Sequence, residues 1–233
     1  MRLRRYGARF IICLAAIVTV NGIPSLAMAN HVPTRVLVYT GNRSFDEGYT
    51  KFGKAARATV VTRAVLPASL SRYRCVVLPI NRVRFRARQK AIFAAYLARG
   101  GRILAIGEHR EFIDAVKTMN NLAASLGAGL RLKPALVAPG FHTTRRIDRS
   151  SFTRHVRAIR FALTSLVTVL VRGHARSLVR TPGGKTFIGA DRMGHGVFIL
   201  AGDSNVFSDD TDTGYSEQDN GVLVHNLCAF PPG

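Results

Sequence analysis

Short, continuously apolar segments alternate with helical patterns in the first half of the chain, and this alternation constrains the fold more than any other feature. Four segments are typical of buried strands: Arg35–Thr40, Thr59–Thr62, Cys75–Leu78 and Arg102–Ile106. Strands without a polar face are typical of parallel sheets that helices cover on both sides. The pattern therefore predicts an α/β fold built on a mostly parallel sheet, with right-handed crossovers.

Helical periodicity fills the intervals between these segments. Phe85–Arg99 places apolar side chains on one face and basic ones on the other, and a glycine pair follows it. A second amphipathic helix is expected over 112–126, again with a glycine as its C-terminal stop. Ser44 and Glu47 have the spacing of a capping box, which predicts a further helix over 45–52.

The second half of the chain predicts additional strands. Residues 130–154 are rich in proline, arginine and threonine, and we expect an irregular excursion there. Strand-like segments separated by turns follow: Ile159–Leu163, Val167–Val171, Ser177–Arg180, Thr186–Ala190 and Gly196–Ala201. An acidic loop then leads to a last helix, Asp219–Ala229, with Asp219 as its N-cap. Since no linker interrupts residues 30–233, we expect them to form one domain.

Residues 1–29 have the pattern of a secretory signal peptide. Four arginines precede the apolar run Phe10–Val20, and Ala27-Met28-Ala29 supplies a small-x-small cleavage pattern. The apolar run is about half as long as a bilayer span requires, which favours cleavage over anchoring. We therefore expect an exported protein, periplasmic or extracellular, with no transmembrane span after cleavage.

Export leaves the state of two cysteines open. Cys75 lies in an apolar segment and Cys228 in the last expected helix. An oxidising compartment would allow the two to form a disulfide. The alternative is a packed thiol, which is common for cysteines in apolar segments.

The charge of the chain is strongly positive, with 34 Lys and Arg residues against 13 Asp and Glu residues. This excess predicts non-specific contact with anionic polymers. However, tryptophan is absent and no arginine-rich block alternates with aromatic residues. These features argue against specific nucleic-acid binding.

Polar residues follow the expected strands at the edge where open parallel sheets bind their ligands. The candidate ligand-binding residues are Asn42, Asn81, Glu108, His109, Asp203 and Asn205. Glu108 and His109 could act as an acid–base pair, or Glu108 and Asp203 could bind a divalent cation. The alternative is that these carboxylates only cap the following helix and turn.

Two further motifs depart from the patterns that they approach. Asp209, Asp210 and Asp212 could form a weak calcium site, although their spacing does not fit an EF-hand and a solvated acidic loop is favoured. Ser204 follows a strand, as the nucleophile of a hydrolase elbow does, but the closing glycine is missing. The scattered histidines do not support structural zinc, and we expect no cofactor.

The segments Leu70–Pro79, Tyr96–Gly107 and Gly202–Asp209 together resemble the class I glutamine amidotransferase-like superfamily, in particular its exported bacterial members. The resemblance spans about residues 35–229 and implies a flavodoxin-like fold. It also implies a cysteine nucleophile on the turn after Arg102–Ile106, where this chain has Gly107-Glu108-His109. Because a carboxylate is a far weaker nucleophile than a thiolate, glutamine hydrolysis by that route is not expected.

Three functions remain open on the sequence alone. The favoured one is a non-catalytic module that binds a small ligand or an envelope protein at the strand-end crevice. The second is a hydrolase that acts on cell-envelope material with Glu108, His109 and Asp203. The third is a structural protein that its positive charge holds in the envelope.

Overall fold

The computed structural model describes residues 34–45, 48–49, 51–170, 173–209, 212 and 214–228. The expected signal peptide therefore lies outside the described residues, as does Glu47 of the capping-box pattern. Among the described residues, no helix combines the length and the apolar character that crossing a membrane requires.

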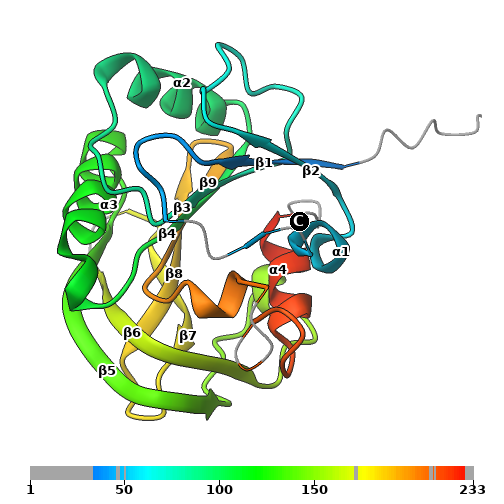
Figure 1. Ribbon diagram of the computed structural model, residues 1–233, viewed down its shortest axis with the longest axis vertical. Coiled ribbons are helices and arrows are strands. Elements are labelled where there is room, and N and C mark those ends of the chain that lie inside the picture. The colour runs from blue at the N-terminus through cyan, green and yellow to red at the C-terminus, as the bar shows by residue number, and fades with distance from the viewer. Residues whose placement is uncertain are drawn as a thin grey trace, which may run out of the picture. The chain divides into compact units, whose positions relative to one another are not determined.

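A seven-stranded sheet in the order β2-β1-β3-β4-β9-β8-β7 forms the centre of the fold (Figure 1). Its strands are β1 (Arg35–Tyr39), β2 (Thr59–Arg63), β3 (Cys75–Pro79), β4 (Arg102–Ile106), β7 (Arg176–Arg180), β8 (Thr186–Met193) and β9 (Gly196–Ala201). The first five in the sheet order are mutually parallel, whereas β8 and β7 are each antiparallel to their neighbours. The predicted α/β class and mostly parallel sheet are confirmed.

Helices cover both faces of this sheet because successive side chains of its strands point to opposite sides. Val36 and Val38 of β1 belong to the core shared with α1 (Phe52–Ala56) and α4 (Asn220–Cys228). Leu37 and Tyr39 belong to the core shared with α2 (Ala87–Ala98) and α3 (Ile113–Leu126). The apolar strands β1, β3 and β4 are thus buried on both faces, as their composition requires. Strand β2, at the edge of the sheet, is largely exposed, so burial of the Thr59–Thr62 segment is not confirmed.

The two longest expected helices are confirmed, whereas the described residues 45, 48 and 49 of the expected helix over 45–52 are not helical. Instead of capping a helix, Ser44 forms an isolated bridge with Asn81, and its hydroxyl donates to the Thr40 carbonyl at 2.9 Å. Helix α1 begins only at Phe52. Local capping chemistry was outweighed here by pairing with the segment that follows β3.

Residues 130–144 form a long strand, which corrects the expected irregular excursion. Strand β5 (Leu130–Thr144) pairs antiparallel with β6 (Ile159–Val169) in a separate two-stranded sheet. Pro134 and Pro139 fall where the register of this pair shifts, so their missing N–H groups interrupt the ladder only at irregular positions. The two strands expected between 159 and 171 are likewise joined in β6.

Helix α4 is fastened to the sheet at its C-terminal end. Cys228 forms a disulfide with Cys75 of β3, and both residues are fully buried. The buried Arg102 guanidinium donates to the carbonyls of Asn226 and Leu227 at 3.0 and 3.1 Å, which satisfies acceptors that the helix leaves open. The question that the sequence left open is answered in favour of the disulfide.

At its N-terminal end, α4 departs from the expectation. Asp219 precedes the helix, but its carboxylate accepts from the N–H groups of Arg157 and Ala158 at 2.8 and 3.1 Å. The side chain therefore joins the helix to the segment before β6.

Candidate functional site

Glu108, which follows β4, is a buried carboxylate with structural partners. Its Oε1 accepts the His109 N–H at 2.9 Å, and its Oε2 accepts the Ser204 N–H at 3.0 Å and also the Ser204 hydroxyl. The side chain is 2% exposed. Since charge-assisted hydrogen bonds of this kind are strong, Glu108 ties the end of β4 to the end of β9.

Asp203 and Asn205, which follow β9, are also engaged with the protein. The Asp203 carboxylate is fully buried and accepts the N–H groups of Ala162 and Val206 at 3.0 and 3.2 Å. The Asn205 amide donates to the Ala162 carbonyl at 3.3 Å. Both residues thereby hold β6 against the turn after β9.

His109 lies beside Glu108 but is directed toward the following turn. Its Nδ1 accepts the Glu111 N–H at 3.4 Å, and its ring packs edge-on against Phe112. Burial lowers the pKa of His109, the Glu111 carboxylate opposes this effect, and Arg110 adds to it. The imidazole is therefore neutral at pH 7. Because its Nδ1 accepts a hydrogen bond, this nitrogen carries no proton and cannot donate one to the Glu111 carboxylate.

The structure brings Glu108 close to the Asp203-Ser204 turn, but the donor set does not fit a metal ion. Among the described residues, no group of three or more His, Cys, Asp or Glu residues is placed to hold one. In the acidic loop, Asp209 accepts the Lys51 N–H at 3.0 Å, Asp212 offers its backbone carbonyl to Arg160, and Asp210 lies outside the described residues. The carboxylates of Glu108, Asp203 and Asp209 thus each accept at least one backbone N–H group.

Asn81 and Asn42 follow the neighbouring strands β3 and β1. The Asn81 amide donates to the Gly41 carbonyl at 2.6 Å, while its buried Oδ1 has no hydrogen-bond partner among the described residues. Asn42 donates to the carbonyls of Val83 and Arg84 at 2.9 and 3.1 Å. Asn42 therefore fastens the loop after β1 to the segment that leads into α2.

The other end of the Asn42 side chain completes this fastening. Its Oδ1 accepts the Tyr39 hydroxyl at 2.7 Å and the Gln89 amide at 3.0 Å. Asn42 has a φ of +58°, a left-handed conformation that asparagine tolerates better than most residues. Together these contacts fix the position of the segments on both sides of a cavity.

This cavity, which we call the arginine cavity, has a volume of about 600 Å³ and lies beside Asn42. Its arginines are Arg43 from the loop after β1, Arg84 and Arg86 from the segment directly before α2, and Arg88 from the first turn of α2. Val65, which is 80% exposed, and Ile92 contribute apolar surface, and none of the described lining residues is an Asp or Glu. The arginine cavity is therefore strongly positive.

Nothing on the described protein neutralises this charge. In the part of the chain that the structure describes, none of the four arginines forms an ion pair. The first turn of α2 contains no acidic residue, so the positive end of the helix dipole adds to the charge. Burial raises the pKa of Tyr39, against the effects of Gln89 and Arg86, which keeps this phenol neutral.

The sequence predicted one lining residue of the arginine cavity but not its arginines. Of the six candidate ligand-binding residues, Asn42 lines it. The missed signal is the series Arg82, Arg84, Arg86 and Arg88, which places an arginine at every second position directly before and into a helix. In the sequence these residues were indistinguishable from the solvated face of that helix.

No protein-family model and no curated protein matches the chain. Among solved structures, the N-terminal domain of mmIFT52 superposes with a TM-score of 0.65 at 15% identity, covering 82% of this chain and 94% of that domain. A ThuA-like protein from Bacteroides uniformis gives 0.53 at 12% identity, covering 83% and 89% of the two chains. These two likenesses therefore show a shared fold and nothing beyond it.

An exo-β-1,4-mannosidase from an Opitutaceae bacterium also shares this fold, with a TM-score of 0.55 at 12% identity. The match covers 85% of this chain and 36% of the mannosidase. The chain thus spans about a third of the length of that enzyme. At such identities the comparisons show the architecture alone.

Proposed function

We propose that this protein is a non-catalytic binding module that holds a phosphate-bearing ligand in the arginine cavity. The observation that carries the proposal is the convergence of Arg43, Arg84, Arg86 and Arg88 on one cavity with no acidic residue among its described lining residues. Like charges brought together in this way repel one another, and a bound anion would relieve that repulsion. Guanidinium groups match the geometry of phosphate oxygens and bind them in a bidentate manner.

The position of the arginine cavity supports a binding role. It lies at the ends of β1 and β2, on the edge where open α/β sheets bind ligands. The N-terminus of α2 borders it, and helix N-termini favour anions because their N–H groups and dipole point outward. The exposed apolar surface of Val65 suits the organic part of a phosphate ester.

The contacts of the buried carboxylates support the absence of catalysis. Glu108 accepts two backbone N–H groups and a hydroxyl, which leaves it poorly placed to take a proton from a substrate. The turn after β4 also carries this glutamate where working amidotransferases have their nucleophilic cysteine. These contacts argue against Glu108 as the base of the hydrolase alternative.

Export remains part of the proposal. The Cys75–Cys228 disulfide supports it, because disulfides form and persist in oxidising compartments such as the periplasm. The signal-peptide pattern of residues 1–29 points to the same location.

The test is calorimetric titration of the purified chain, without its signal peptide, with inorganic pyrophosphate. In the variant R84Q/R86Q/R88Q we expect the Kd to rise at least about tenfold, since a single hydrogen bond to a charged group contributes about 1.5–3 kcal/mol. The matched control R145Q/R149Q/R157Q removes the same charge from exposed arginines outside the cavity lining. Equal losses of affinity in the two variants would show that net charge, and not the arginine cavity, binds the anion.

A further inference from the structure

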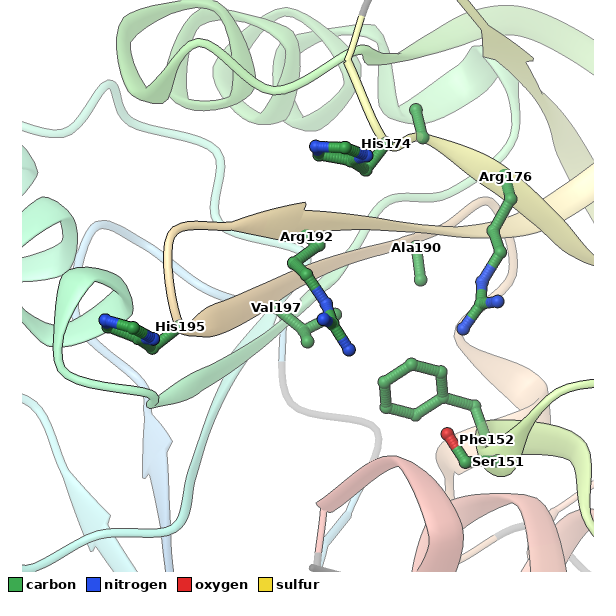
Figure 2. Close-up of a pocket in the computed structure, with 9 residues that line it drawn as sticks. Ser151, Phe152, His174, Arg176, Ala190, Arg192, His195 and Val197 are labelled. Atoms are coloured by element: carbon green, nitrogen blue, oxygen red, sulfur yellow. The ribbon is translucent and has the colours of Figure 1, made fainter. Parts of the chain in front are cut away.

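A second positively charged cavity of about 490 Å³ lies elsewhere on the molecule (Figure 2). Arg176 at the start of β7 and Arg192 near the end of β8 line it, together with His174, His195 and Phe152. Its lining, as far as the structure describes it, contains no Asp or Glu. We call this the β7–β8 cavity.

The two arginines of the β7–β8 cavity are arranged to act together. Figure 2 shows both side chains extending from neighbouring strands toward the ring of Phe152. The Arg176 guanidinium lies 5.7 Å from the centre of that buried ring, a cation–π contact that orders the side chain without neutralising its charge. Among the described residues, neither arginine forms an ion pair.

A third arginine nearby is already used by the fold. Arg102 contacts the same Phe152 ring at 5.3 Å, but its guanidinium donates to the last carbonyls of α4. Phe152 thus contacts both a structural arginine and Arg176. The hydrogen-bonding capacity of Arg176 and Arg192 remains directed toward the β7–β8 cavity.

The sheet topology places the two cavities at opposite corners. The arginine cavity lies at the C-terminal ends of the parallel strands β1 and β2. Because β8 is antiparallel to β9, and β7 to β8, the residues of the β7–β8 cavity lie at the other edge of the sheet. Four strand spacings, about 19 Å, separate β1 from β8, which exceeds the Debye length of about 8 Å at physiological salt.

We propose that the β7–β8 cavity is a second, independent phosphate-binding site, and that the protein consequently bridges two phosphate-bearing molecules or surfaces. The second site stands on its own geometry, whereas bridging rests also on the proposed function of the arginine cavity. The shared chemistry is the phosphate group, whether a lipid headgroup or a soluble polyphosphate carries it. Each site engages one partner, on opposite edges of one rigid sheet.

The experiment is the stoichiometry of pyrophosphate binding, measured by calorimetry. A site is counted only where its Kd stays within about tenfold of the wild-type value. On that count we expect two sites per wild-type chain, one in R176Q/R192Q, one in R84Q/R86Q/R88Q, and two in the control K54Q/K117Q, which removes two exposed charges from helix surfaces. A single site in the wild type, or two sites retained in R176Q/R192Q, would overturn the second site. If R84Q/R86Q/R88Q instead keeps both sites, the function proposed for the arginine cavity fails while the β7–β8 site stands.

Bridging has its own readout. Wild type and K54Q/K117Q should cross-link phosphatidylglycerol vesicles or condense soluble polyphosphate, and turbidity measures both. The choice between these two ligands shows whether a lipid headgroup or a soluble polymer carries the phosphate. Each cavity variant should still co-sediment with its partner but should not cross-link it. Cross-linking by R176Q/R192Q at the wild-type level, or none by the wild type with either substrate, would contradict bridging.

Discussion

The disulfide between Cys75 and Cys228 should account for a large part of the stability of this fold. It closes a loop between residues 153 positions apart and joins β3 to the last turn of α4. The loop-entropy relation gives about 5 kcal/mol for a loop of this length. For a chain of this size, such a loss corresponds to a fall in Tm of roughly 10–20 °C.

The assay is urea unfolding of the wild type and of C75A/C228A, with the free energy of unfolding obtained by linear extrapolation. Wild type that is unfolded and refolded in reductant should approach the stability of the variant, because it lacks the same cross-link. Reductant should leave the variant itself unchanged. The reasoning is refuted if the free energies of wild type and variant agree within about 1 kcal/mol while alkylation and mass measurement show that the wild-type disulfide is intact.

Three further predictions follow from the site. E108Q should lower the free energy of unfolding by about 2–3 kcal/mol, because an amide N–H₂ would face the Ser204 or His109 donors. It should leave the pyrophosphate Kd unchanged, and a raised Kd would count against a purely structural Glu108. In N42G the glycine tolerates the left-handed backbone, but the side chain that positions the Arg84 segment is lost. Pyrophosphate binding should therefore weaken about threefold or more. An unchanged Kd would refute that positioning role. Burial lowers the folded-state pKa of His109, so as the pH falls below about 6.5 the unfolded state takes up its proton before the folded state does. Below that pH, wild type should therefore lose free energy of unfolding faster than H109Q. Parallel pH profiles of the two proteins in urea unfolding would contradict this.

The central strands and long helices could be predicted because their signals are local. The β3 segment is apolar throughout, and β1 and β4 are apolar after a leading arginine, which specifies burial on both faces. Helix α3 combines an amphipathic face with a left-handed glycine at its end. Residues 130–144 could not be predicted in this way. Their strand exists because β6 pairs with it, and the two prolines that argued against a strand fall where the register shifts.

The candidate site was predictable only in part, for a related physical reason. The rule that ligands bind at strand ends led to Asn42, which does line the arginine cavity. It led equally to Glu108 and Asp203, whose carboxylates accept backbone N–H groups across the ends of β4, β6 and β9. The sequence shows which polar residues lie at the ends of the strands. Which of these side chains form hydrogen bonds within the protein depends on tertiary contacts.

The most direct test of the account is a crystal structure of the protein with bound pyrophosphate. We predict phosphate oxygens within hydrogen-bond distance of the guanidinium groups of Arg84, Arg86 or Arg88 in the arginine cavity. An empty arginine cavity in crystals whose pyrophosphate is bound at other surfaces would contradict it.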